Sequence, residues 1–461
     1  MAILRAYTVP HPPLAIPGVG RGQENGIRKT LSAFEEISSE IAGLAPETIV
    51  FITPHNTLYS DYFHISPGTS ARGDFSRFND HRTRIEAEYD CALAAEIIRL
   101  AEGAGIPAGH LGERDAKLDH GVTVPMWFIS NHYPGYKIVR VSQSGLQPSD
   151  HYRLGRLIAE AAETTGRKTV LIASSDLSHK LSQGGSYGFA PEGPEFDSII
   201  AEVLSGGDFL SLLKIPAALR ERAAECGYNS LTVLAGCFDR REVKANLLSY
   251  EGPFGVGYAI AAFEPGEPDN GRDFLEQFLK FSSGNARDSQ SMEDPYRALA
   301  RSALEHKLKN SGDLPVPDGL PDEMTDERAG VFVSLHKDGM LRGCIGTIAP
   351  TTKSVAAEIM QNAVSAGLHD SRFAPVTVSE LPYLTYKVDV LSAPEPVSDP
   401  DQLDVKRYGV IVSRGHRRGL LLPNLDGVDT VAEQISIARQ KAGISKSDAV
   451  KLERFEVIRH E

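Results

Sequence analysis

The stretch KTVLIASSDLSH, residues 168–179, joins a continuous apolar run to a polar segment that ends in a histidine. An uninterrupted run of this length, rich in β-branched residues, is typical of a strand buried on both faces of a sheet. Two further stretches have the same character, TIVFITPH (residues 48–55) and YKIVRVSQSG (residues 136–145). Because such strands need helices on both faces, the sequence predicts an α/β domain around them.

The segments around these strands complete the pattern. Apolar residues recur at steps of three and four in residues 27–44, and residues 92–101 and 154–162 have the same helical character. Residues 244–252 and 255–263 are predicted as two closing strands. In a sheet of this kind we expect the active site at the carboxyl ends of the strands.

A change of composition in the middle of the chain marks a domain boundary. The residues between Glu264 and Pro295 are rich in Gly, Pro, Ser, Asp and Asn, apart from one short amphipathic piece, FLEQFLKF. This composition is typical of a linker. We therefore expect a first domain in residues 1–265, a linker in residues 266–292 and a second domain in residues 293–461.

Hairpins indicate that the second domain has a different architecture. GVFVSLHKDGMLRGCIGT (residues 330–347) is a strand, an Asp-Gly turn and a second strand, and residues 409–423 form another hairpin pattern. Residues 383–391 alternate apolar and polar side chains like a half-buried strand, while residues 355–364 and 430–443 are predicted helices. The sequence thus predicts a smaller α+β domain.

The composition excludes several classes of protein. The 461 residues include 48 Lys and Arg against 61 Asp and Glu, and the net charge of −13 disfavours binding to nucleic acid or to an anionic membrane. We find no apolar run of about 18 residues that would span a membrane. Four cysteines in so long a chain are not a disulfide framework, and the start lacks the basic region of a signal peptide. We expect a cytoplasmic protein that acts on small molecules.

Four polar residues stand just past apolar, strand-like runs of the first domain: His11, His55, His179 and Glu251. Strand ends meet at one edge of an open α/β sheet, so these side chains could converge there. Two imidazoles and one carboxylate suit non-haem Fe(II), and a further histidine is a candidate acid/base. The same set with Zn²⁺ would suit a hydrolase. Each histidine also fits a solvated loop position, and spacing alone leaves these interpretations open.

The motifs that carry these residues resemble a known family. They are VPHPPL with His11, TPHNTLYSDYF with His55, KLDHGVTVPMWF with His120, SSDLSH with His179 and YEGPFGVGYA with Glu251. Together they resemble the catalytic subunit of class III extradiol ring-cleavage dioxygenases of the LigB type, a family that includes the Memo-like proteins. The resemblance runs from about residue 5 to residue 263.

This resemblance implies a site and a reaction. Residues matching His11, His55 and Glu251 bind Fe(II) in the family, and those matching His120 and His179 line the substrate site, with His179 as the acid/base. The substrate would be an aromatic ortho-diol that is opened by O₂. Memo-like relatives replace the carboxylate by another residue, whereas Glu251 retains it here. We therefore expect Fe(II), with Zn²⁺ or Cu as alternatives.

The second half resembles another family. LRGCIGT (residues 341–347), HDSRFAPVTVSEL (residues 369–381) and GLLLPNLDGVDTVAEQISIARQKAGI (residues 419–444) are similar to the AMMECR-type domain, also named AmmeMemoRadiSam system protein A. The resemblance covers about residues 293–459. The family name records an association of this domain with a Memo-like domain and a radical SAM protein, so the resemblance implies a radical SAM partner.

Three residues of the second half are candidates for chemistry. Cys344 follows Arg342 by two positions in a predicted strand, which places both on one face. A neighbouring guanidinium would lower the pKa of the Cys344 thiol and make it nucleophilic or metal-binding. Arg342 could also hold an anionic ligand together with Arg372. The alternative is that Cys344 is a small buried residue of the strand.

The main hypothesis is an Fe(II)-dependent extradiol dioxygenase fused to an AMMECR-type domain. One alternative is a metal-binding regulatory or scaffold protein of the Memo type, without dioxygenase turnover. The other is a Zn²⁺-dependent hydrolase. The identity of the aromatic substrate and the oligomeric state are not set by the sequence.

Overall fold

The structure is a computed structural model that describes residues 2–310, 312–425 and 427–461. The chain divides into two compact units, Met1–Phe281 (unit 1) and Ser282–Glu461 (unit 2). Residues 266–292, which we predicted as a linker, are not irregular, because they contain the 18-residue helix α10 (Phe274–Ser291). The amphipathic piece FLEQFLKF opens this helix, which continues through the polar residues that follow.

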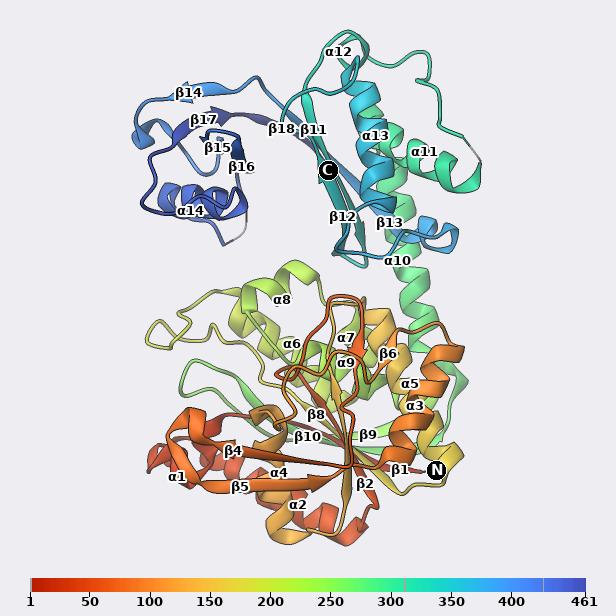
Figure 1. The fold of residues 1–461 in the computed structure, drawn as a ribbon. Coiled ribbons are helices and arrows are strands. Elements are labelled where there is room, and N and C mark those ends of the chain that lie inside the picture. The colour runs from red at the N-terminus through yellow and green to blue at the C-terminus, as the bar shows by residue number, and fades with distance from the viewer. Residues whose placement is uncertain (1, 311, 426) are drawn as a thin grey trace. The chain divides into compact units, whose positions relative to one another are not determined.

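A six-stranded sheet forms the centre of unit 1, in the order β7-β2-β8-β1-β10-β9 (Figure 1). The strands in chain order are β1 Ile3–Val9, β2 Thr48–Thr53, β7 Lys137–Ser142, β8 Thr169–Ser174, β9 Arg241–Glu251 and β10 Tyr258–Pro268. β7, β2, β8 and β1 are parallel, whereas β10 is antiparallel to both of its neighbours, β1 and β9. The predicted α/β fold is confirmed.

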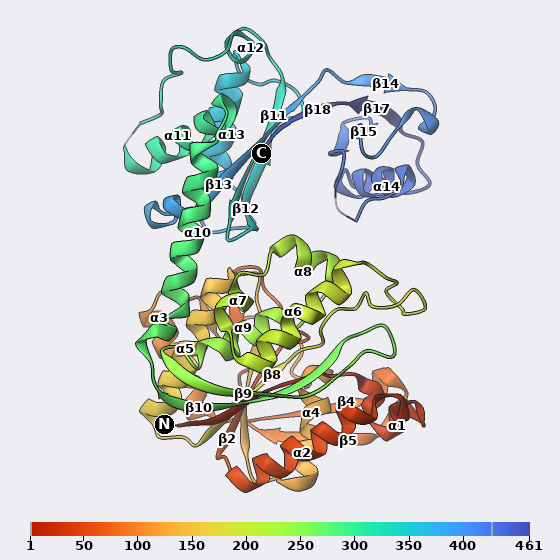
Figure 2. The same cartoon turned by 180° about the vertical axis from the view of Figure 1, so that it is seen from behind.

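Helices cover both faces of this sheet (Figures 1 and 2). Ile49 and Phe51 of β2 pack against α2 and α4, and the alternating residues Val50 and Ile52 belong to the apolar cluster that includes α3, α5, α6 and α9. This alternation explains why the four central residues of β2 are all apolar. No helix in the described part of the chain is long and apolar enough to cross a membrane.

The remaining elements of unit 1 are helices, short 3-10 turns and two small ribbons. The helices are α1 Pro17–Gly20, α2 Arg28–Leu44, α3 Cys91–Gly103, α4 His120–His132, α5 Pro148–Thr165, α6 Glu192–Gly206, α7 Phe209–Leu213, α8 Ala217–Ala223 and α9 Tyr228–Gly236. The 3-10 turns are η1 Pro13–Ala15, η2 Gln23–Ile27, η3 Ser76–Phe78 and η4 Asn270–Arg272. The ribbons pair β3 Phe63–His64 with β6 Ala108–Gly109, and β4 Ser70–Phe75 with β5 Asp80–Glu88.

The strand register sets where the site lies. β8 is flanked by β1 and β2, and all three strands run in the same direction. Val9 of β1 is level with Ser174 of β8, and Ile52 of β2 is level with Ala173. The carboxyl ends of β1 and β2 therefore lie level with each other, on either side of the carboxyl end of β8. His11 and His55 are each the second residue after their strand.

Unit 2 is an α+β domain with two four-stranded sheets. The first has the order β12-β11-β13-β18 and the second β14-β17-β15-β16. The strands are β11 Gly330–Lys337, β12 Met340–Gly346, β13 Leu384–Leu391, β14 Glu395–Val397, β15 Gly409–Arg414, β16 Arg417–Leu421, β17 Lys451–Phe455 and β18 Val457–His460. The helices and 3-10 turns are α11 Pro295–Lys309, α12 Asp322–Thr325, α13 Val355–Leu368, α14 Val431–Lys441, η5 Val378–Tyr383 and η6 Pro400–Gln402.

Both predicted hairpins of unit 2 are present. β11 and β12 are joined at Asp338 and Gly339, whose φ angles are 53° and 77°. Positive φ at both central residues is the geometry that an Asp-Gly turn favours between antiparallel strands. The second predicted hairpin corresponds to β15 and β16. The α+β class predicted for the second domain is confirmed.

Candidate metal centre

Three side chains converge at the carboxyl edge of the unit 1 sheet. The Nε2 atoms of His11 and His55 lie 3.0 Å apart, and the Sγ atom of Cys226 lies 3.6 Å from His11 Nε2. All three ligand atoms lie within 4.8 Å of one another, and this is the one group of this kind within the described residues. Two imidazoles and one thiol at this separation can serve as the donor set of a single metal ion.

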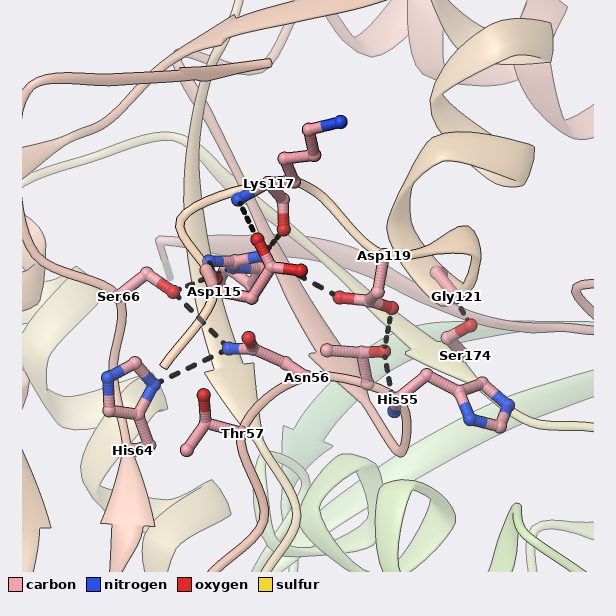
Figure 3. Close-up of polar contacts among 12 residues, drawn as sticks. His55, Asn56, Thr57, His64, Ser66, Asp115, Lys117, Asp119, Gly121 and Ser174 are labelled. Atoms are coloured by element: carbon pink, nitrogen blue, oxygen red, sulfur yellow. Dashed lines mark hydrogen bonds and ion pairs between the residues drawn. The ribbon is translucent and has the colours of Figure 1, made fainter. Parts of the chain in front are cut away.

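Hydrogen bonds fix the tautomer of His11. The Ser174 hydroxyl donates its proton to the carbonyl oxygen of Gly121 over 2.6 Å, and Figure 3 shows this pair beside His55. Ser174 Oγ is therefore the acceptor in its 2.9 Å contact with His11 Nδ1. His11 thus carries its proton on Nδ1, and the lone pair of Nε2 points to His55 and Cys226. Burial and the neighbouring histidines lower the pKa of His11 well below 6.5.

His55 is held through the threonine that ends β2. The Oγ1 atom of Thr53 accepts the backbone N–H of His55 at 3.3 Å and donates to Asp119 Oδ1 over 2.6 Å. Asp119 directly precedes α4, so the carboxylate connects two segments that carry site histidines (Figure 3). Burial lowers the pKa of His55, which keeps the imidazole neutral and able to bind a metal.

A buried arginine forms an ion pair with Asp119. Arg140 of β7 is fully buried, and its Nη1 atom lies 3.8 Å from Asp119 Oδ2. The same guanidinium donates to Ser66 Oγ and to the carbonyl oxygen of Lys117, each over 2.6 Å, and to Glu113 over 3.3 Å. These bonds tie residues 113–119 to the edge strand β7, and so they fix the approach to α4.

The two histidines predicted to line the substrate site lie close to the metal-ligand group. His120, the first residue of α4, stacks on His55 with ring centroids 4.1 Å apart, and its ring lies 5.4 Å from that of His11. Burial is the main cause that lowers the pKa of His120 to about 3, and a proton on the neighbouring His55 would oppose a second proton on His120. His120 is therefore a neutral side chain at the site.

A hydrogen bond to a backbone carbonyl oxygen fixes the tautomer and orientation of His179. Its Nδ1 atom lies 2.6 Å from the carbonyl oxygen of Ala224, which can only accept, so Nδ1 carries the proton. The Nε2 atom then has a free lone pair. Burial lowers the pKa of His179, so the ring is neutral at pH 7. A neutral imidazole with a free Nε2 is a base that can take a proton from a substrate.

Cys226, the third member of the group, was not among the predicted ligands. It lies in the short loop between α8 and α9, where Gln143 Nε2 donates to its carbonyl oxygen over 2.8 Å. The following glycine, Gly227, packs so tightly that a Cβ atom would lie 2.5 Å from the side chain of Ser175. No spacing identifies Cys226 in the sequence, because its partners follow distant strands and it has no neighbouring cysteine or histidine in the chain.

Glu251, the expected third ligand, is not part of the group. Its Oε1 atom accepts the backbone N–H and the hydroxyl of Thr30, each over 2.7 Å. Thr30 lies in the first turn of α2, where unpaired N–H groups attract a carboxylate. β9 is also two strands away from β1, a lateral distance of about 10 Å at the usual strand spacing. The assignment of Glu251 as a metal ligand is corrected for these reasons.

Asp176 is a second carboxylate near the centre. Its Oδ1 atom accepts the backbone N–H of His11 over 2.8 Å, and its Oδ2 atom lies 3.7 Å from His11 Nε2. Burial raises the pKa of Asp176 to about 7. Through its hydrogen bond with the backbone N–H, the carboxyl group of Asp176 helps to hold His11 in place.

The candidates of unit 2 are occupied by ion pairs. Arg342 donates from Nε and Nη2 to the two carboxylate oxygens of Glu380, over 2.9 and 3.2 Å. Arg372 makes a similar pair with Asp370, over 2.9 and 2.6 Å. The two guanidinium groups bind different carboxylates, and the expectation that they hold one anionic ligand stays a prediction.

Cys344 lies in the edge strand β12. Its N–H donates to Asp370 Oδ2 over 2.9 Å and its carbonyl oxygen accepts Arg372 Nη2 over 3.1 Å, so both backbone groups face away from β11. Opposite it, the hydroxyl of Ser334 donates to the Sγ atom over 3.2 Å. The guanidinium beside Cys344 is therefore that of Arg372, and it caps the strand edge. Reactivity of the thiol stays a prediction.

The fold and the site define an α/β protein with a histidine-rich candidate metal centre, joined to an α+β domain. Residues 5–261 match the family described as the catalytic LigB subunit of aromatic ring-opening dioxygenase, and residues 297–460 match AMMECR1. The LigB match covers more than half of the chain, so the chain belongs to the LigB family. The two matches occur in the order expected from the sequence motifs.

Several relatives and solved structures are similar to this chain. Protein CA_C1420 of Clostridium acetobutylicum is 40% identical over 468 residues, which cover 100% of this chain and 99% of that protein. A Thermotoga maritima protein is 49% identical over 170 residues, 36% of this chain and 98% of its own length. The crystal structure of the uncharacterized protein PH0010 from Pyrococcus horikoshii is 30% identical, with a TM-score of 0.33, and covers 36% of this chain and 88% of its own. The structure of JW3007 from Escherichia coli K12 is 14% identical, with a TM-score of 0.37, and covers 56% of this chain and 99% of its own.

Proposed function

We propose that unit 1 binds one metal ion through His11, His55 and Cys226 and uses O₂ to open the ring of an aromatic ortho-diol. The observation that carries the proposal is the convergence of the three ligand atoms within 4.8 Å in a domain of the LigB family. His120 and His179 add two neutral imidazoles beside this group. The proposed metal is Fe(II), the ion that suits O₂ chemistry at a mononuclear site with open positions.

The donor chemistry fits a divalent metal ion. His11 and His55 are neutral, and His11 directs the lone pair of Nε2 into the group. Cys226 would lose its thiol proton on binding, as a sulfur ligand does. Fe(II) held there would supply a redox-active centre at which the diol and O₂ meet.

The residues around the metal would bind the substrate and move its protons. His179 would accept a proton from a diol hydroxyl at Nε2, because Nδ1 is committed to the carbonyl oxygen of Ala224. The same atom would return the proton to the opened product. His120, stacked on His55, would form one wall of the substrate site.

A second candidate function follows from Cys226. A thiolate in place of a carboxylate favours Zn²⁺ or Cu over Fe(II), and it is a replacement of the kind that distinguishes Memo-like relatives from the dioxygenases. With Zn²⁺ the site would activate water as a hydrolase does. With either ion bound and no turnover, unit 1 would be a metal-binding regulatory protein.

Metal analysis of protein purified without air tests the ligand set. We expect about one metal ion per chain in the wild type, and a large loss in His55→Ala and Cys226→Ser. Glu251→Gln is the matched control, because the amide oxygen of the glutamine can still accept the hydrogen bonds of Thr30. Since Glu251 lies outside the ligand group, we expect this substitution to leave the metal content unchanged. Loss of metal in Glu251→Gln with retention in Cys226→Ser would reverse the assignment of the third ligand.

O₂ consumption with a panel of catechols tests the reaction. We expect uptake by the iron-loaded wild type with at least one catechol, and a ring-opened product. Bound zinc without O₂ uptake, together with hydrolysis of an ester or amide, would support the hydrolase instead. Bound metal without either activity would support the regulatory function.

A further inference from the structure

An exposed aromatic side chain lies beside the candidate acid/base. The ring of Tyr187 meets the ring of His179 edge to face, with centroids 5.0 Å apart and an interplanar angle of 75°. Nevertheless, 58% of Tyr187 is exposed. Burial of the ring therefore contributes little to the stability of the fold, and most of the side chain is accessible to a ligand that binds beside His179.

The loop that carries Tyr187 is closed by backbone contacts. Ala190 N donates to the carbonyl oxygen of Lys180 over 3.1 Å, and Leu181 and Phe189 form an antiparallel bridge. These contacts hold the two ends of the loop together and leave residues 182–188 as its tip. Tyr187 sits on this tip, next to the closing bridge.

The loop is also anchored to the segment that precedes β10. Leu181 N donates to the carbonyl oxygen of Gly255 over 3.1 Å. Gly185 lies so close to Gly255 that a Cβ atom added to it would come within 3.2 Å of the Gly255 Cα atom. Gly255 has a φ of +84°, which glycine adopts without strain. The glycines of QGGSYG thus allow the loop to pack closely against this segment. The closing contacts of the loop and its packing against Gly255 together fix the position of Tyr187 relative to His179.

We propose that Tyr187 contacts the ring of the bound substrate and thereby strengthens the binding of aromatic ligands. This inference rests on the proposed function, because it assigns the substrate of the same site. Aromatic rings attract each other when their centroids lie about 4.5–7 Å apart. Tyr187 is already held at such a distance from the His179 ring, so a bound aromatic ring could contact it without a large rearrangement of the loop.

Anaerobic absorbance titration with 4-nitrocatechol tests the contact in metal-loaded protein. Tyr187→Phe retains the ring, whereas Tyr187→Leu retains apolar bulk without a ring. We expect Tyr187→Phe to bind within about twofold of the wild type, and Tyr187→Leu to bind about three- to tenfold more weakly, the range of measured aromatic pair contributions. Metal content should be equal in all three proteins, because Tyr187 is not a ligand.

The outcomes separate this inference from the proposed function. Equal affinity of the wild type and Tyr187→Leu would overturn the role of Tyr187 and leave the dioxygenase proposal intact. The expected difference in affinity, with no O₂ uptake, would support the contact and overturn the reaction. Failure of the metal-loaded wild type to bind 4-nitrocatechol would overturn both the contact with an aromatic ring and the diol substrate.

Discussion

The Nδ1–H of His179 donates to the carbonyl oxygen of Ala224 over 2.6 Å, and Ala224 lies two residues before Cys226. The loop between α8 and α9 therefore holds the candidate acid/base and supplies the sulfur atom of the candidate metal centre. Ala224 has a φ of 52°, an unusual value for a residue with a side chain. This conformation turns the backbone so that the carbonyl oxygen meets His179.

Removal of the His179 imidazole should abolish proton transfer and spare the metal. We expect His179→Ala to retain its metal ion and to lose about 10²- to 10⁴-fold in kcat, the usual contribution of a general acid/base. Because burial lowers the pKa of His179 below 6.5, more than half of the base is deprotonated at pH 6.5, and its activity is lost as the pH falls through the lowered pKa. Steady-state O₂ uptake against pH measures both effects. A variant that loses its metal would show that His179 is a ligand.

Ser174 should control metal affinity through the tautomer of His11. Ser174→Ala removes the acceptor of the His11 Nδ1–H, and loss of such a support typically weakens metal binding about 10- to 100-fold. Ser175→Ala is a matched control, since Ser175 is equally buried and its hydroxyl contacts Thr8 instead. Competition with a chromophoric chelator gives the two affinities. Equal weakening in both variants would point to general destabilisation.

The sequence predicts the fold because buried parallel strands leave a strong pattern. β2 and β8 are apolar on both faces, and their histidines follow within a few residues, so the convergence of His55 and His179 follows from parallel strand ends meeting at one edge. His11 follows β1 in the same way. The helix α10 was missed because Ser, Gly and Asn in its second half suggest a linker, although the first half is amphipathic.

The third ligand of the candidate metal centre could not be predicted from the strand pattern. β9 reads as one more strand with a carboxylate at its end, but nothing local in the sequence shows that two strand spacings separate it from β1. Nor does the sequence show that the first turn of α2 will hold Glu251 through Thr30. Cys226 belongs to a loop whose position depends on how α8 and α9 pack, which is a tertiary property.

Acid should destabilise unit 1 through its buried neutral histidines. Burial lowers the pKa of His64 and of His151 to about 4, whereas an unfolded histidine titrates near pH 6.5. The unfolded chain therefore binds more protons below pH 6.5, and stability falls as the pH drops from 6.5 towards 4. Each of these two residues would cost on the order of 3 kcal/mol by pH 4. Thermal unfolding at a series of pH values measures the slope.

A glutamine in place of one buried histidine provides the control for this slope. His151 donates from Nδ1 to the carbonyl oxygen of Gln147 and accepts the Ser144 N–H at Nε2, and both bonds are neutral. His151→Gln cannot take up a proton, so its stability should fall less steeply between pH 6.5 and 4 than that of the wild type. An unchanged slope would mean that His151 does not contribute to the acid sensitivity.

In unit 2, Arg342 should stabilise the fold through Glu380. The guanidinium makes a two-pronged pair with this carboxylate, and Lys337 Nζ lies 3.3 Å from the same group. We expect Arg342→Met and Glu380→Gln to be coupled by about 1–3 kcal/mol in a double-mutant cycle of unfolding. Additive effects, together with loss of binding to an anionic ligand, would support the earlier expectation for Arg342.

Replacement of Arg140 should destabilise unit 1 more than that of any exposed arginine. The guanidinium is fully buried and faces the carboxylates of Glu113 and Asp119. Arg140→Met leaves these carboxylates without their cation, and the loss of one partner from a buried ion pair costs about 3–5 kcal/mol. Arg72, which pairs with Glu86 at the surface, is the matched control, because Arg72→Met should change stability little. Urea unfolding followed by circular dichroism compares the two variants.

The Arg140 substitution should also weaken metal binding at the candidate centre. Asp119 accepts the hydroxyl of Thr53, whose oxygen in turn accepts the backbone N–H of His55. Without Arg140 the segment before α4 loses its anchors at Glu113 and Lys117. We therefore expect Arg140→Met to weaken metal binding as well as stability, when both are measured at a temperature where the variant is folded. Full metal affinity in a folded Arg140→Met protein would show that His55 keeps its position without this support, and that the buried arginine serves stability alone.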